Sequence, residues 1–140
     1  MKNIYFSFLI SGLLFVTACS NAQKKSSNDN KNSTAMYQNV NANDFEKGAS
    51  QADVVLIDVR TPMEFGSGHI QNAKLMDISS PTFANDIEKL DKSKTYYLYC
   101  RSGARSSSAS QYMVSKGFTK VYNLSGGIIS WAQAQKTLVR

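Results

Sequence analysis

Residues Tyr96, Tyr97, Leu98 and Tyr99 form a run that is apolar or aromatic at every position. Successive side chains of a β-strand point to opposite faces of a sheet, so a strand of this composition has to be covered on both faces. Sheets that are covered on both faces are almost always parallel, with helices as the connections between strands. The run therefore predicts a central strand of a parallel sheet that lies between two layers of helices.

The remaining segments alternate in the way that such a fold requires. Strands are predicted at residues 54–58, 73–76, 95–100 and 120–123, and helices or helical turns at 41–47, 62–65, 81–90, 106–116 and from 127 onward. Asn41 or Asn43 is expected to cap the first helix, and Thr61 the second. The alternation predicts one α/β domain over residues 36–140, with a modest core that includes Trp131.

Cys100 follows the aromatic run directly and precedes a segment that is predicted to be helical. The residues of the intervening loop are Arg101, Ser102, Gly103, Ala104 and Arg105. In a tight loop before a helix, backbone N–H groups converge on a group at this position and stabilise an anion there. Gly103 lets the backbone turn inward, and the two arginines add fixed positive charge. Cys100 is therefore predicted to be a nucleophile that is held as a thiolate.

The length of this loop separates two kinds of cysteine chemistry. Cysteine-dependent phosphatases place one more residue between the cysteine and the arginine, so that the loop encloses a tetrahedral phosphate, whereas four residues separate Cys100 from Arg105. The shorter loop favours transfer of a smaller group, such as a single sulfur atom. A phosphatase or an arsenate reductase is the less favoured alternative, because it shares the same logic of a cysteine, a loop and an arginine.

Several segments of the chain resemble the rhodanese-type sulfurtransferases in their order and spacing. They are residues 56–65 and 68–73, which resemble the family's amino-terminal signature, residues 100–106, which resemble its active-site loop, and residues 117–123 and 124–131, which resemble its closing part. The resemblance extends over residues 36–140. It implies a single rhodanese-like domain with a five-stranded parallel sheet and helices on both faces. It also implies that Cys100 is catalytic and that residues 101–105 bind the substrate.

Asp58 and Arg60 stand at the end of the predicted strand 54–58, at the edge where open α/β sheets bind ligands. They are expected either to form an ion pair that holds the neighbouring loop or to contact the substrate, and by resemblance they help to shape the pocket.

His69 is the only histidine, which excludes a zinc site with several histidines. By resemblance it holds a loop. We expect no metal and no cofactor.

The resemblance implies a double displacement. The Cys100 thiolate would take sulfur from a small anionic donor, thiosulfate or a persulfide, and the resulting persulfide would pass it to cyanide or a thiol. Arg101 and Arg105 are expected to orient the donor. Two further alternatives are a sulfur-relay or persulfide carrier that turns over thiosulfate poorly, and a non-catalytic interaction module with the same fold. The protein is expected to be a monomer.

The amino-terminal residues predict export and a lipid anchor. Residues 1–18 have the lysine, apolar core and small residues of a signal peptide, and the core is too short for a transmembrane helix of about 20 residues. Residues 16–19 resemble the bacterial lipobox, in which the cysteine is diacylated; a plain secretory signal is the alternative. Residues 19–35 are predicted to be a flexible tether. We therefore expect a protein of the bacterial cell envelope, anchored by Cys19 to a membrane outside the cytoplasm.

Charge and cysteine content fit this division of the chain. The net charge is +6, of which four Lys and one Asp give +3 to residues 1–35 and the remainder gives +3 to residues 36–140. The predicted domain is only mildly basic and lacks the concentrated charge of a nucleic-acid-binding surface, so no nucleic-acid partner is expected. If Cys19 is lipidated, Cys100 has no partner for an internal disulfide, as expected for a functional thiol.

Overall fold

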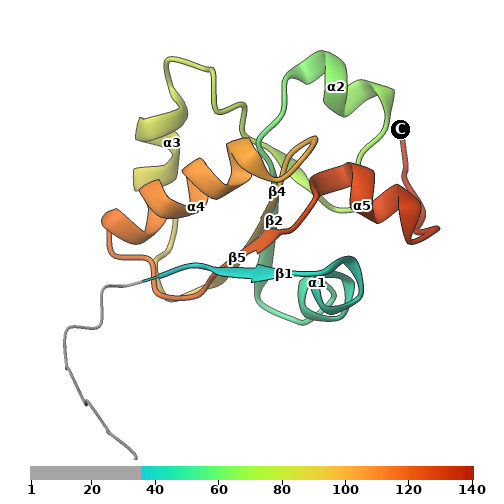
Figure 1. The fold of residues 1–140 in the computed structure, drawn as a ribbon. Helices are drawn as coiled ribbons and strands as arrows, with labels where there is room; N and C mark the ends of the chain where they lie inside the picture. The colour runs from blue at the N-terminus through green and yellow to red at the C-terminus, as the bar shows by residue number, and fades with distance from the viewer. Residues whose placement is uncertain (1–35) are drawn as a thin grey trace, which may run out of the picture. The chain divides into compact units, whose positions relative to one another are not determined.

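In the computed structural model, which describes residues 36–140, five parallel strands form one sheet in the order β1-β5-β4-β2-β3 (Figure 1). The strands are β1 (Gln38–Val40), β2 (Val54–Asp58), β3 (Lys74–Leu75), β4 (Thr95–Tyr99) and β5 (Val121–Leu124). The helices are α1 (Ala42–Ala49), α2 (Pro62–Ser67), α3 (Phe83–Glu88), α4 (Ala104–Ser115) and α5 (Gly127–Gln133). The predicted α/β fold with a five-stranded parallel sheet is confirmed. The predicted signal peptide, the lipidation site Cys19 and the predicted tether lie outside the described residues.

β4 is the middle strand of the sheet, and its side chains alternate between two hydrophobic clusters. Tyr96 and Leu98 belong to the cluster that includes residues of α3 and α4, whereas Tyr97 and Tyr99 belong to the cluster that includes residues of α1 and α5. All four side chains are buried. Figure 1 shows α3 and α4 on one side of the sheet and α1 and α5 on the other. The aromatic run is therefore the doubly covered central strand that the sequence predicts.

β1 is the strand that the sequence patterns did not locate. It lies at an edge of the sheet and pairs with β5 alone. Gln38 and Asn39 are exposed, and only Val40 is partly buried. A short strand that buries so little apolar surface leaves no periodic pattern in the sequence. It supplies the fifth strand that the family resemblance implied.

Some predicted boundaries are wrong by a few residues. α4 begins at Ala104, two residues earlier than predicted, because Gly103 takes a left-handed conformation with φ 93° and the helix starts directly after it. α3 and β3 are shorter than the predicted segments 81–90 and 73–76. The correction to α4 matters for function, because it moves Arg105 from the loop into the first turn of the helix.

The first two helices begin as their sequences predict. Asn41 accepts hydrogen bonds from the N–H groups of Asn43 and Asp44 at the start of α1. At the start of α2, the Thr61 hydroxyl accepts a bond from the N–H of Glu64, and the Glu64 carboxylate accepts one from the N–H of Thr61. This reciprocal arrangement is a capping box. It fixes the Glu64 carboxylate at the amino end of α2.

Trp131 on α5 lies in the core, as predicted, with 4% of its surface exposed. Its ring packs edge to face against Phe45 of α1 with the ring centroids 6.2 Å apart. Its indole N–H donates a hydrogen bond of 3.0 Å to the carbonyl of Thr137, which ties the chain beyond α5 to the domain. Within residues 36–140, no helix is both long enough and apolar enough to cross a membrane.

Candidate functional site

Cys100 is the first residue after β4, at the carboxyl end of the middle strand. Asp58, the last residue of β2, is the register partner of Tyr99. The ends of these two neighbouring strands therefore place Cys100 and the residues after Asp58 at one edge of the sheet. This is the edge at which parallel α/β sheets bind their ligands.

The Cys100 sulfur lies within a set of hydrogen-bond donors. The N–H of Gly103 donates to it over 3.1 Å and the hydroxyl of Ser106 over 3.4 Å. Burial raises the pKa of the thiol, but hydrogen bonds from the Ser106 hydroxyl and from the N–H groups of Ser106, Ser102 and Gly103 outweigh burial and lower the pKa overall. Within the described residues Cys100 is unpaired, and it is buried. The predicted convergence of loop N–H groups on the sulfur is what the structure shows.

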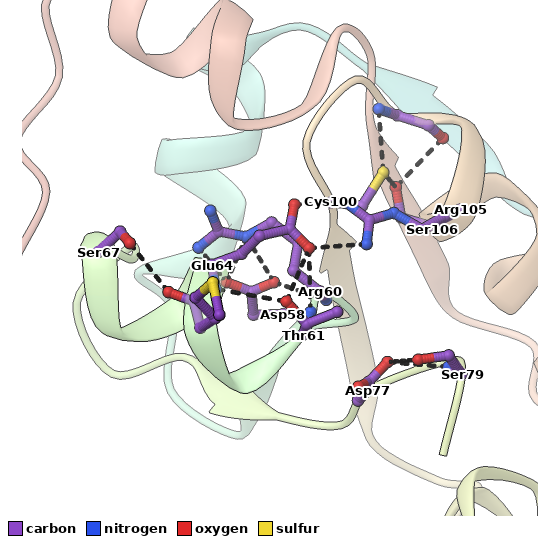
Figure 2. A network of polar contacts seen from close by, with 12 residues as sticks. Asp58, Arg60, Thr61, Glu64, Ser67, Asp77, Ser79, Cys100, Arg105 and Ser106 are labelled. Carbon is purple, nitrogen blue, oxygen red and sulfur yellow. Dashed lines mark hydrogen bonds and ion pairs between the residues drawn. The ribbon is translucent and has the colours of Figure 1, made fainter. Parts of the chain in front are cut away.

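Arg105 does not simply add free positive charge beside the sulfur. Its two terminal nitrogens donate to the two carboxylate oxygens of Glu64 over 2.9 and 2.7 Å, in a bidentate ion pair between α4 and α2 (Figure 2). The pKa of Arg105 is raised, chiefly by the bond to Glu64 and also by the charge of the Cys100 thiolate. The guanidinium therefore interacts with two anionic groups.

The same pair lowers the pKa of Glu64 to about 2, chiefly through the hydrogen bond from Arg105. Because the folded-state pKa is lower than the ordinary value of 4.5, the stabilisation from this pair is complete above pH 4.5 and is lost as the pH falls toward 2. Glu64 is a residue of the site that the sequence patterns did not indicate. The signal that could have found it was the capping-box pattern Thr61-x-x-Glu64, which fixes the direction of this carboxylate.

The other predicted loop residues have distinct positions. Arg101 is exposed, and its carbonyl accepts a hydrogen bond from the N–H of Ile129 over 3.3 Å. Ser102 contributes through its backbone N–H, which helps to lower the thiol pKa. Ala104 is the first residue of α4. The predicted loop thus divides into a backbone part that faces the sulfur, a helical part and one exposed arginine.

The amino end of α5 closes the loop from a further direction. The N–H of Ile128 donates to the carbonyl of Cys100 over 2.8 Å. Gly127 lies very close to the backbone of the loop. A Cβ at this position would be 2.5 Å from the Cys100 carbonyl oxygen and 2.6 Å from the carbonyl carbon of Arg101. Gly127 also has a positive φ of 59°. A glycine is therefore required where α5 meets the loop.

Asp58 and Arg60 form a buried ion pair with each other (Figure 2). The side chain of Asp58 is 0% exposed and that of Arg60 is 6% exposed, with 2.6 Å between Nη2 and Oδ2. The same Nη2 donates to the carbonyl of Gly68 over 2.8 Å, at the carboxyl end of α2. Of the two predicted roles, an ion pair that holds a loop is the one that these contacts support.

His69 also holds a loop, in agreement with the expectation for it. Its ring stacks on Phe65 with the centroids 3.7 Å apart, and its backbone forms an isolated bridge with Val139.

Within residues 36–140, no group of three or more His, Cys, Asp or Glu side chains is arranged to hold a metal ion. Two cavities of about 550 Å³ each are lined by residues other than Cys100 and its loop. The candidate site is therefore defined by the donors around the sulfur.

Comparison with known sequences agrees with this geometry. Residues 41–134 match the rhodanese-like domain. A protein named sulfurtransferase from Allochromatium vinosum is 39% identical over 85 residues, which are 61% of this chain and 78% of that protein. A tRNA uridine(34) hydroxylase from Yersinia pestis is 38% identical over 90 residues, which are 60% of this chain and 25% of that protein. The chain thus corresponds to about a quarter of the hydroxylase's length.

Solved structures show the same fold. A rhodanese-related protein from Thermoplasma volcanium aligns with a TM-score of 0.65 and 29% identity, covering 74% of this chain and 98% of that one. A rhodanese-like domain protein from Staphylococcus aureus aligns with a TM-score of 0.60 and 28% identity, covering 67% of this chain and 90% of that one. Each alignment covers at least 90% of the solved chain, so the fold of the described domain is the fold of these two proteins.

Two glycines provide a test of how α5 holds the loop. Gly127→Ala is expected to lower the free energy of unfolding by about 2 kcal/mol or more, because the new Cβ meets backbone atoms and the residue has a positive φ. Gly66→Ala in α2 is the control, because a Cβ there meets nothing within 4 Å, and it should stabilise the protein by up to about 1 kcal/mol. Urea denaturation measures both. Equal effects of the two substitutions would contradict the assigned contact.

The lowered pKa of Cys100 predicts how its alkylation depends on pH. The rate of reaction with iodoacetamide, followed on the Cys100 peptide by mass spectrometry, should reach its midpoint at a lower pH than for a free cysteine. Ser106→Ala should move the midpoint upward, because the sulfur loses a donor while its burial persists. Ser108→Ala, on the exposed side of α4, should leave the midpoint unchanged. An unchanged midpoint in Ser106→Ala would refute this role of the hydroxyl.

Proposed function

Because the chain belongs to the rhodanese-like domain family, we propose that it is a sulfurtransferase in which Cys100 carries the transferred sulfur as a persulfide. The observation that carries this proposal is the set of donors around the thiol, with the Gly103 N–H at 3.1 Å and the Ser106 hydroxyl at 3.4 Å. These donors favour a thiolate at neutral pH, and the thiolate is the nucleophilic form of cysteine. The similarity to a protein named sulfurtransferase supports the same assignment.

The proposed reaction has two displacements at sulfur. In the first, the Cys100 thiolate attacks the outer sulfur of a donor such as thiosulfate, a new S–S bond forms, and sulfite leaves with the electron pair of the broken S–S bond. In the second, cyanide or a thiolate attacks the outer sulfur of the persulfide, and the S–S bond to Cys100 breaks with its electron pair going to the Cys100 thiolate, which is the leaving group. The released product is thiocyanate when cyanide is the acceptor and a new persulfide when a thiolate is. The two steps balance without an external oxidant or reductant, and the enzyme returns to its starting form.

The residues around the sulfur have separate proposed roles in these steps. The N–H groups of Ser102 and Gly103 and the hydroxyl of Ser106 stabilise the thiolate and then the persulfide anion that replaces it. The exposed Arg101 attracts and orients the anionic donor. Arg105 contributes more weakly than an unpaired arginine would, because Glu64 occupies both of its terminal nitrogens.

The nucleophile is tested with Cys100→Ser. This variant should lose sulfur transfer from thiosulfate to cyanide by at least about a thousandfold, because a serine hydroxyl is not ionised at neutral pH. After incubation with thiosulfate, the Cys100 peptide of the wild-type protein should gain the mass of one sulfur atom, and the variant peptide should gain nothing. A variant that retains transfer would refute the assignment. A wild-type protein that gains sulfur but does not pass it to cyanide would indicate a persulfide carrier instead.

We also propose that the protein is exported and anchored to a membrane through two acyl chains on Cys19. The apolar residues 4–16 and the lipobox-like residues 16–19 support this proposal. Two acyl chains are enough for stable anchoring, whereas one is marginal. The sulfur chemistry would then take place outside the cytoplasm, next to a membrane surface.

Expression of the full chain in a bacterial host tests the anchor. The wild-type protein should appear in the membrane fraction, with an amino-terminal peptide that begins at Cys19 and carries acyl chains. Cys19→Ser should remove the lipid and the cleavage at this position, because the modification requires the thiol. A wild-type protein without lipid in the soluble fraction would show a plain secretory signal or no export.

A further inference from the structure

The ion pair between Glu64 and Arg105 places a carboxylate beside the proposed site of sulfur transfer. The guanidinium of Arg105 is attracted both to Glu64 and to the Cys100 thiolate. The two side chains of the pair are 29% and 36% exposed, respectively, so a molecule that approaches from solvent meets both. The carboxylate is therefore part of the electrostatic environment of an incoming donor.

Glu64 is held in this position from a second side. Its Oε2 atom accepts hydrogen bonds from the N–H and the hydroxyl of Thr61, each over 3.1 Å, in addition to the bond from Arg105. Pro62, at the first position of α2, restricts the backbone at this point. The carboxylate cannot swing away from Arg105 without breaking the cap of its own helix.

The charges around the sulfur largely cancel. Arg105 is paired with Glu64 and Arg60 with Asp58, and among the ion pairs of residues 36–140 none includes Arg101. The thiolate and Glu64 together carry two negative charges, and Arg105, with one positive charge, interacts with both of them. An environment without net positive charge does little to attract a dianion, and Glu64 repels a dianion twice as strongly as a monoanion at the same place.

We propose that Glu64 is a specificity-determining residue, which makes the donor site favour sulfur donors with one negative charge over dianionic donors such as thiosulfate. This inference rests on the proposed sulfurtransferase function. The favoured class contains organic thiosulfonates and singly charged persulfides. Since the pKa of Glu64 is about 2, the carboxylate keeps its charge at any pH at which Cys100 ionises.

Two donors that differ in charge but react through the same kind of bond make this inference testable. Thiosulfate carries two negative charges and methanethiosulfonate carries one. In each case the Cys100 thiolate attacks the terminal sulfur, an S–S bond forms with Cys100, and the bond from that sulfur to the oxidised sulfur breaks. Sulfite leaves from thiosulfate and methanesulfinate from methanethiosulfonate, each with the electron pair. In a double displacement, kcat/KM for the donor reports this first step alone.

The experiment compares kcat/KM for the two donors, with cyanide as the acceptor, in the wild-type protein and in Glu64→Gln. Gln is tolerated at this position of a capping box, so α2 should keep its cap. We expect the ratio of kcat/KM for thiosulfate to that for methanethiosulfonate to rise about fivefold to tenfold in Glu64→Gln. Both donors are measured on one protein sample, so a partly unfolded fraction or an altered thiol pKa cancels from the ratio.

Glu88→Gln is the matched control. Glu88 is a carboxylate in an exposed ion pair with Lys116. Its substitution by Gln changes the net charge by the same amount as Glu64→Gln, but on α3 instead of α2. Lys116 is at the carboxyl end of α4, whereas the Cys100 loop is at its amino end, about eleven residues or 16 Å away along the helix. The control should leave the donor ratio within about twofold of the wild-type value, because exposed charges separated by more than a Debye length of about 8 Å are screened at physiological salt. An equal ratio in wild type and Glu64→Gln, or an equal rise in Glu88→Gln, would overturn the inference.

Failure of the underlying function gives a different result from failure of this inference. If Cys100 in the wild-type protein gains no sulfur from either donor, as measured by peptide mass, the sulfurtransferase proposal fails and this inference fails with it. If Cys100 gains sulfur from both donors but Glu64→Gln leaves their ratio unchanged, only the specificity role of Glu64 is refuted.

Discussion

The hydrogen bonds donated to the Cys100 sulfur are the interaction around which the site is built. Burial alone would raise the pKa of this thiol, because it disfavours the anion. The donors from Gly103 and Ser106 reverse that effect, and their positions follow from the left-handed Gly103 and from α4 beginning directly after it. On the other side of the loop, the N–H of Ile128 holds the Cys100 carbonyl. The thiolate thus depends on the mutual placement of β4, α4 and α5, with Ser106 as the side chain that completes it.

A second set of contacts fixes α2 against this arrangement. Asp58 and Arg60 form a buried ion pair at the carboxyl end of β2, and Arg60 also donates a hydrogen bond to the carbonyl of Gly68 where α2 ends. Removal of one partner of a buried pair costs about 3–5 kcal/mol, so this anchor is not easily displaced. The capping box holds the other end of α2. With both ends fixed, Glu64 has a defined direction, and its bond to Arg105 connects α2 to the first turn of α4.

The parts of this structure that were predictable from sequence are those with a local cause. The aromatic run of β4 predicted a doubly covered parallel sheet, and the loop after Cys100 predicted backbone N–H groups directed at the sulfur. β1 was missed because three residues that bury little apolar surface carry no pattern. The pair of Glu64 and Arg105 joins residues 41 positions apart, so only the folded chain reveals that the predicted free cation beside the sulfur is partly neutralised. For Asp58 the sequence left two roles open, and complete burial beside its partner favours the loop-holding one.

The two carboxylates at this edge of the sheet differ in what they can influence. Asp58 is fully buried and paired, so it acts on the fold, whereas Glu64 is partly exposed and acts on any charged molecule that approaches the sulfur. Because the pKa of Glu64 is about 2, its charge stays constant over the range in which the Cys100 thiol ionises. The pH dependence of the reaction would then report the thiol, whereas the dependence on donor charge would report Glu64. Reactivity and donor preference are therefore separable properties of this site, because they arise from different residues.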